Sequence, residues 1–151
     1  RGPTVPGVDL ESARNAAYVL IAAHVGGSQK STTYNLKTLS DTECKFCKRS
    51  IVEMQEHSIA GQRLSDDFWW RAPELYVGPP LEGEEHHLVL MRFESSEWKY
   101  VDADGQVVDS TPAESGKLLF EVRHARDGWV VSEVRLLNEQ QWANLAVLME
   151  E

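Results

Sequence analysis

The chain is poor in cysteine, in basic residues and in long apolar runs, and each shortage narrows what the protein can be. Its 151 residues include two cysteines. No hydrophobic stretch approaches the ~20 residues needed to cross a bilayer. Acidic side chains outnumber basic ones by 24 to 15, which gives a formal net charge of −9. A negative surface repels phosphate backbones and anionic lipid headgroups, so we expect neither nucleic acid nor a membrane surface as a partner.

The motifs of several common enzyme classes are also missing. The sequence has no Gly-x-Ser-x-Gly, no Walker loop, no dinucleotide fingerprint and no His-Glu-x-x-His. Carboxylates are plentiful, but without a known pocket no two of them can be paired as acid and base. We therefore assign no catalytic residue and expect no cofactor.

Length and composition predict one ordinary globular domain. Hydrophobic residues make up 42% and charged residues 26% of the chain, a normal balance. Residues 1–8 are rich in Pro and Gly and indicate the end of a flexible tether, which leaves 9–151 as the expected domain. Since the sequence opens on Arg1 rather than Met, we expect it to derive from a longer precursor. A missing export signal then does not indicate the cytoplasm.

Cys44 and Cys47 are the most informative residues that are present. Such a pair can form a disulfide, a redox couple or half of a metal site. A thioredoxin-type couple follows a strand, whereas this pair follows a helical segment and a polar connector. A metal site needs a second pair, but the adjacent His86 and His87 would point to opposite faces of a strand. We expect both histidines to be solvated, and we favour a structural disulfide in an exported protein.

Helical spacing dominates the first sixty residues. Apolar residues at 13, 16, 17, 20, 21 and 25 predict a helix with one buried stripe, capped by Asp9. The pair Gly26-Gly27 is expected to end or bend this helix. Ser40 and Glu43 fit a capping box, so a second helix is expected to begin at residue 40 or 41 and to close at 60–61.

The later part of the chain alternates like strands. Segment 88–93 is apolar on both faces, which is typical of a central strand, and Asp127-Gly128 predicts a hairpin into 129–134. Asn138 is expected to cap a short C-terminal helix. The order of elements predicts an α+β fold, with N-terminal helices packed on a curved antiparallel sheet of about four to six strands. The other sheet face should meet solvent, the tail helix or a second subunit.

Aromatic residues supply the candidates for a binding site. A curved sheet covered by helices often encloses a pocket, and we take Trp70, Trp98, Tyr18 and Tyr100 as its candidate residues. The alternative interpretation is a plain aromatic core.

One acidic segment has the opening of a calcium-binding loop. Asp102-x-Asp104-Gly105 begins like such a loop, but the acidic ligands and the closing Glu that should follow are missing. A turn into a return strand is the better interpretation, and we expect no metal site.

Three segments, Leu39–Cys47, Val101–Pro112 and Asp127–Val131, carry a resemblance to a known family. Residues 9–137 resemble a group of actinobacterial lipoproteins of unknown function, whose members look like cone-shaped α+β domains of the nuclear-transport-factor-2-like (NTF2-like), or SnoaL-like, type. The resemblance implies a lipid-anchored protein outside the cytoplasmic membrane, with its lipidated Cys upstream of Arg1. It also implies a disulfide between Cys44 and Cys47, and no established activity.

The function expected from the sequence is a non-enzymatic cell-envelope domain that binds a small ligand or an envelope protein. A homodimer through the open sheet face is a further expectation. The alternative is a small cone-fold enzyme, an isomerase or hydratase that uses a carboxylate with a Tyr or His in its cavity. Tyr18, His24 and Asp102 are the first residues to consider for that role.

Overall fold

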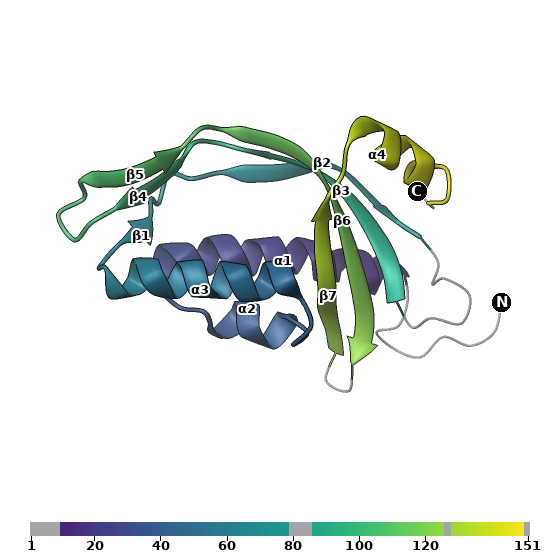
Figure 1. Ribbon diagram of the computed structural model, residues 1–151, viewed down its shortest axis with the longest axis horizontal. Coiled ribbons are helices and arrows are strands. Elements are labelled where there is room, and N and C mark those ends of the chain that lie inside the picture. Colours follow the sequence, from purple (N-terminus) through teal and green to yellow (C-terminus); the bar gives the residue numbers. More distant parts are fainter. Residues whose placement is uncertain (1–9, 79–85, 126–127, 150–151) are drawn as a thin grey trace.

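The computed structural model describes residues 10–78, 86–125 and 128–149, and it has the predicted α+β architecture (Figure 1). Three helices come first, then the strands, then a short helix. The elements are α1 Leu10–Lys30, α2 Tyr34–Leu39, α3 Lys45–Ile59, β1 Arg63–Leu64, β2 Trp70–Val77, β3 His86–Ser95, β4 Trp98–Val101, β5 Val107–Thr111, β6 Glu114–Ala125, β7 Gly128–Leu136 and α4 Glu139–Ala146. The expected tether 1–8, the expected cap Asp9 and the turn residue Asp127 lie outside the described residues.

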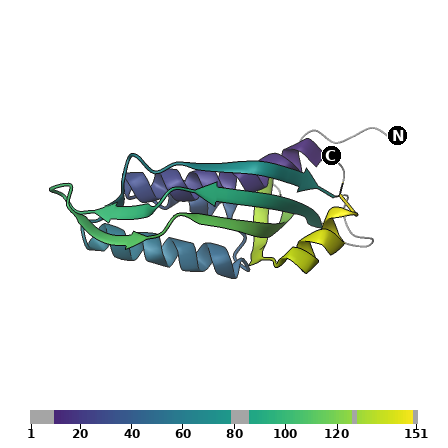
Figure 2. The ribbon, with the colours of Figure 1, turned by 90° about the horizontal axis from the view of Figure 1, so that it is seen from above.

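The described strands form two antiparallel sheets with the orders β1-β4-β5 and β2-β3-β6-β7. The described strands number seven, whereas one sheet of about four to six was expected. The additional sheet forms because the two-residue β1 and the return strand β5 both pair with β4. Strand β3 lies between β2 and β6, as its two apolar faces predict. The strands arch over α1 and α3, and Figure 2 shows the long strands running lengthwise along both helices.

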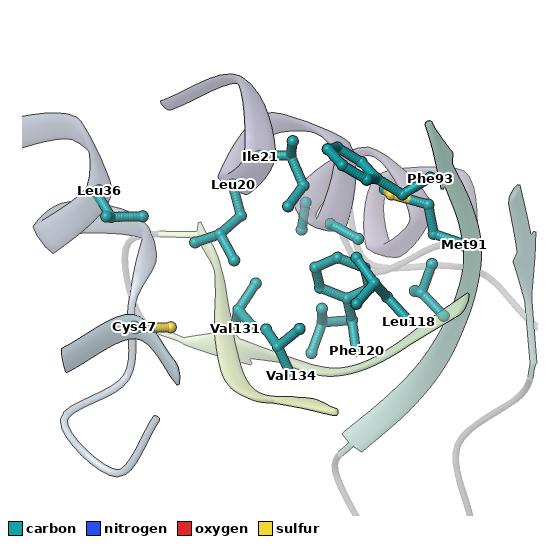
Figure 3. Close-up of a cluster of buried hydrophobic side chains, with 14 of the residues drawn as sticks. Leu20, Ile21, Leu36, Cys47, Met91, Phe93, Leu118, Phe120, Val131 and Val134 are labelled. Atoms are coloured by element: carbon teal, nitrogen blue, oxygen red, sulfur yellow. The ribbon is translucent and has the colours of Figure 1, made fainter. Parts of the chain in front are cut away.

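Helix α1 packs closely against the inner face of the sheets because its contact stripe is built largely from small residues. Ala13, Ala17 and Leu20 are completely buried, and Met91 and Phe120 from the sheet are buried opposite them. Figure 3 shows Leu20, Met91 and Phe120 in one cluster. The buried stripe predicted for the first helix is therefore confirmed, and it forms the centre of the main core.

Helix α1 does not end at Gly26-Gly27 but continues to Lys30. A side chain at position 27 would lie 2.4 Å from the carbonyl oxygen of Thr32 and 2.6 Å from the Met54 side chain. Glycine is required there because the returning chain and α3 pack directly on the helix backbone. The glycine pair thus marks a close contact between distant segments rather than the end of the helix.

The predicted capping box at Ser40 and Glu43 is wrong, and α3 begins later, at Lys45. Cys44 is the N-cap, and its sulfur accepts a hydrogen bond from the Cys47 amide at 3.1 Å. Ser40 instead donates its hydroxyl proton to the Leu36 carbonyl. Segment 40–41 is used to reach β7, since the Asp41 amide donates to the Val131 carbonyl at 2.9 Å.

Helix α4 covers part of the outer sheet face. This tail helix was one of the three partners expected for that face. Asn138 caps the helix in a full capping box with Gln141, as its position predicts. Trp142 is buried against Leu88, Leu90 and Leu119 in a second, smaller apolar cluster. The tail helix therefore gives the curved sheet a packed layer on each side (Figure 1).

Candidate functional site

A cavity of about 1110 Å³ lies between α1, α3 and the concave face of the sheets. Ligand pockets in proteins commonly enclose about 300–1,000 Å³, so this space is large enough for a small organic molecule. The side chains that line it come from both helices and from β3 to β7: Ile21, His24, Phe46, Arg49, Ser50, Glu53, His57, Phe93, Trp98, Tyr100, Asp109, Thr111, Ala113, Glu114, Ser115, Gly116, Leu118, Val134, Arg135 and Leu136.

Two polar atoms in this lining are buried without a hydrogen-bond partner among the described residues: His24 Nδ1 and Trp98 Nε1. Their rings meet edge to face with the centroids 5.9 Å apart. Trp98 is held in place from another side by Phe68, at a ring-centroid distance of 4.1 Å. Because both nitrogens are closed off from solvent, a molecule in the cavity does not reach them without a movement of the rings.

Burial lowers the pKa of His24 from 6.5 to about 4, because the charged imidazolium would lose its hydration. The ring is therefore neutral at physiological pH, with one nitrogen able to donate a hydrogen bond and the other able to accept one. His24 lines the cavity from α1, and Leu20, Ile21 and Val25 around it belong to the main core.

Tyr100 and His57 form a rigid part of the cavity wall. Their rings are stacked with the centroids 3.7 Å apart, and His57 Nδ1 is 2.9 Å from the side-chain oxygen of Gln62. Burial is the main cause that raises the pKa of Tyr100, so its hydroxyl stays protonated at neutral pH. Tyr100 also shares a side-chain hydrogen bond with Ser28 on α1.

Helix α3 contributes a polar stripe that the sequence analysis did not identify. Arg49, Glu53 and His57 follow one another at intervals of four residues and all line the cavity. This spacing places them on one face of a helix, beside the buried Ser50 and Met54. Polar residues bordering an apolar stripe were therefore the signal that could have identified this wall.

The four aromatic candidates divide into two pairs. Trp98 and Tyr100, two residues apart on β4, point the same way and line the cavity. Tyr18 and Trp70 contact each other elsewhere, with ring centroids 4.7 Å apart, and Trp70 lies 6.0 Å from the Phe93 ring. Neither is among the lining residues, and the Tyr18 side chain is 47% exposed.

Of the three residues considered for catalysis, His24 alone lines the cavity. Asp102 holds its own turn, where its Oδ1 accepts from the amides of Asp104 and Gln106 at 2.9 and 3.0 Å. This is the turn into a return strand that was favoured over a calcium loop. Within the ranges that the structure describes, no group of three or more His, Cys, Asp or Glu side chains is placed to hold a metal ion.

Cys44 and Cys47 form a disulfide, with the sulfur atoms 2.08 Å apart, which confirms the predicted pairing. Both side chains are completely buried. Thiol–disulfide exchange requires a thiolate to reach one of the sulfurs, and burial opposes that attack. The position at the first turn of α3 gives the disulfide a structural task, because α3 forms one wall of the cavity.

The expectation that His86 and His87 are both solvated is wrong for His87, which is 7% exposed. Because β3 already begins at His86, strand alternation turns the next side chain inward. Its ring meets the Trp129 ring edge to face at a centroid distance of 5.2 Å. Burial also lowers the pKa of His87, so it is a core residue rather than a surface one.

Comparison with known proteins defines the class of fold. The intermembrane space region of the chloroplast protein ARC6 is similar over 91% of this chain and 100% of its own, with a TM-score of 0.64 and 15% identity. An uncharacterised Caulobacter vibrioides protein with a cystatin-like fold matches with a TM-score of 0.51 and 11% identity, over 90% of this chain and 97% of that one. Aln2 from a Streptomyces species matches with a TM-score of 0.51 and 7% identity, over 95% and 98%.

These identities show a shared fold and nothing further. The chain is a cone-shaped α+β domain of the cystatin-like, or NTF2-like, type. No protein-family model and no curated protein sequence matches it. Within the described residues, every helix is too short or too polar to traverse a lipid bilayer.

Proposed function

We propose that the domain binds a small organic molecule in the cavity between α3 and the sheet, and that it does so without catalysis. The observation that carries this proposal is the cavity of about 1110 Å³ between two helices and the concave face of the sheets. Aromatic and aliphatic side chains such as Phe93, Trp98 and Leu118 share the lining with polar side chains, including the charged ones of α3 and β5 to β7. Such a lining suits a molecule that has an apolar body and some polar groups.

We further propose that the domain works outside the cytosol. Disulfides persist in oxidising compartments, and a fully buried bond between Cys44 and Cys47 agrees with such a location. A lipid anchor, a role in the cell envelope, an envelope partner and a homodimer through the sheet face stay predictions. Mass spectrometry after thiol labelling tests the compartment: chain purified from its natural source should label at Cys44 and Cys47 only after denaturation and reduction. Labelling after denaturation alone would contradict an oxidising location.

Titration with Nile red, a neutral apolar dye that fluoresces in apolar surroundings, tests the binding function. We expect saturable fluorescence with the wild-type chain. Trp98→Ala should weaken the dye's affinity about tenfold, because it removes the largest aromatic wall of the cavity. Trp69→Ala is the matched control, since Trp69 is 53% exposed and does not line the cavity. Equal affinities in all three proteins would place the dye elsewhere and refute the proposal.

A catalytic role is the second candidate, and one observation favours it. Asp109 on β5 lies directly opposite Tyr100 on β4, and both line the cavity. A carboxylate beside a protonated tyrosine is a pairing that isomerases use for proton transfer. Deuterium exchange into an enolisable ketone in D₂O, followed by ¹H NMR, tests this role. Exchange that is faster with the wild-type chain than with Tyr100→Phe would favour the enzyme.

A further inference from the structure

We infer that the cavity binds an organic cation, an ammonium group on an apolar body, and that the carboxylates of Glu53, Asp109 and Glu114 attract its charge. The inference rests on the proposed function and names the class of ligand. It follows from which charged side chains turn into the cavity and from the sign of their charge.

Strand register decides which charged residues of the sheets face the cavity, because residues paired across neighbouring strands share a face. Asp109 on β5 pairs with Tyr100, whose ring lies in the cavity wall, so Asp109 is on the inner face. Glu114 comes two residues before Gly116, which pairs with the buried core residue Phe93. Since alternate residues of a strand share a face, Glu114 is on the inner face too.

The same reasoning takes the charge of Arg135 out of the cavity. Arg135 borders the cavity, but it pairs with Leu119, which belongs to the apolar cluster under α4 on the outer face. Its guanidinium lies 3.9 Å from the carboxylate of Glu121, two residues along the strand from Leu119. Arg135 therefore carries its charge on the outer side of the sheet.

Helix α3 places Glu53 at the same end of the cavity as Asp109. Glu53 is one turn before His57, which stacks on Tyr100. Burial is the main cause that raises the pKa of Tyr100, and the charges of Glu53 and Asp109 raise it further, so both carboxylates act on one hydroxyl. Arg49 is eight residues before His57, about 12 Å along the helix. The C-terminal carbonyls of α3 add negative potential at the His57 end.

The side chains that face the cavity from the described residues thus bring three carboxylates against one guanidinium, that of Arg49. None of the three carboxylates forms an ion pair with a described residue. All three are exposed, so a ligand in the cavity reaches them without movement of the wall. A cation gains from this excess of negative charge, and an anion is repelled. Phe93, Trp98 and Leu118 offer contacts for an apolar body.

Three matched probes test the inference: benzyltrimethylammonium, benzyl methyl sulfone and phenylmethanesulfonate. They share a benzyl group and a tetrahedral polar head, and they differ in carrying a charge of plus one, zero or minus one. Each is titrated into the wild-type chain by calorimetry at pH 7 and low salt. We expect the cation to bind about tenfold more tightly than the sulfone and the sulfonate to bind most weakly. High salt should weaken binding of the cation and leave that of the sulfone unchanged.

Two substitutions remove charge and keep the shape of the side chain. Glu53→Gln and Asp109→Asn should each weaken binding of the cation about threefold, and together about tenfold, with no change for the sulfone. Glu56→Gln is the matched control, because Glu56 is an exposed residue of the same helix that does not line the cavity. It should leave all three affinities unchanged.

The outcomes separate the two proposals. Equal affinities for the cation and the sulfone would overturn the inference, and so would tightest binding of the sulfonate. A preference for the cation that survives the double substitution would also overturn it, since the carboxylates would not be its cause. Failure of Nile red and of all three probes to bind would instead refute the proposed binding function itself.

Discussion

The two helices beneath the sheet meet it in different ways. Helix α1 presents small and aliphatic residues to the inner face, and Ala13, Ala17 and Leu20 are completely buried there. Helix α3 presents Arg49, Glu53 and His57 alongside Ser50 to a cavity of about 1110 Å³, and His57 stacks on Tyr100 of β4. We call the first region the closed half of the cone and the second the open half.

The difference teaches where this fold places stability and where it leaves room for a ligand. In the closed half, apolar side chains fill the space between helix and sheet, and their close packing stabilises the fold. In the open half, aromatic rings from β4 and a polar surface of α3 line the same cavity. Substitutions in the closed half should therefore affect mainly stability, and substitutions in the open half mainly binding.

Phe120→Ala should have the largest effect on stability. Phe120 is completely buried in the closed half, and its truncation leaves a cavity that the packed neighbours fill only in part. We expect a loss of about 3–5 kcal/mol in the free energy of unfolding, measured by urea denaturation. Phe46→Ala, at a half-buried residue of the cavity wall, should cost less than half as much. Similar losses for both would remove the distinction between the halves.

Acidification should destabilise the protein through His24, at the boundary of the two halves. The pKa of His24 is lowered from 6.5 to about 4, so the unfolded chain binds the proton more readily. Stability should thus fall by up to about 3 kcal/mol as the pH drops from about 6.5 to about 4. Denaturation midpoints measured across this range should change less in His24→Gln. An unchanged pH slope in that variant would mean that the histidine is not buried as described.

Removing the disulfide should weaken the attachment of the cavity wall. Cys44→Ser with Cys47→Ser deletes the bond but keeps a side chain able to cap α3, so the loss reports the covalent link. We expect about 2 kcal/mol, a modest value because the closed loop is short. The double alanine variant should lose about 1 kcal/mol more, since it also removes the cap. If reductant lowers the stability of the double serine variant as much as that of the wild-type chain, the loss of stability does not come from the disulfide.

Asp41→Asn should have the smallest of these effects. Asp41 is 10% exposed and accepts a hydrogen bond from Arg123 Nε at 2.7 Å, which is the first cause that lowers the pKa of its carboxyl group. This contribution is present at neutral pH and is lost as the pH falls through the lowered pKa. We expect a loss of about 1–2 kcal/mol at pH 7.

Asp66→Asn is the matched control for this prediction. Asp66 pairs with Arg63 at 3.1 Å, but its side chain is 80% exposed. An exposed ion pair contributes about 0–1 kcal/mol, so the control should lie near the lower end of that range. Equal losses at the two positions would show that burial of the Asp41–Arg123 pair adds nothing to its contribution to stability.

Local patterns predicted the parts of the fold that depend on neighbours in sequence. Asn138 predicted the cap of α4, and the two apolar faces of 88–93 predicted the central strand. The spacing of Cys44 and Cys47 at a helix start made the disulfide a reasonable choice among three alternatives.

Features that depend on distant segments were not predictable from such patterns. Gly27 is needed because Thr32 and Met54 pack directly against its backbone. The sequence pattern reads the same glycine as a helix end, since these two contacts come from other segments. The site shows the same limit. Trp98 and Tyr100 were identified by residue type, but their neighbours Glu53 and His57 come from a helix whose distance from β4 only the tertiary structure gives.

Chemical-shift mapping tests the central claim most directly, because it locates a ligand without a variant. ¹⁵N-labelled protein would be titrated with benzyltrimethylammonium, and the amide and indole resonances followed. The largest shifts should fall on the Trp98 indole and on the amides of Ser50 and Gly116, which line the cavity, while the Trp142 indole under α4 should not move. Shifts centred on Trp142, or none at saturating probe, would contradict a ligand cavity in the open half of the cone.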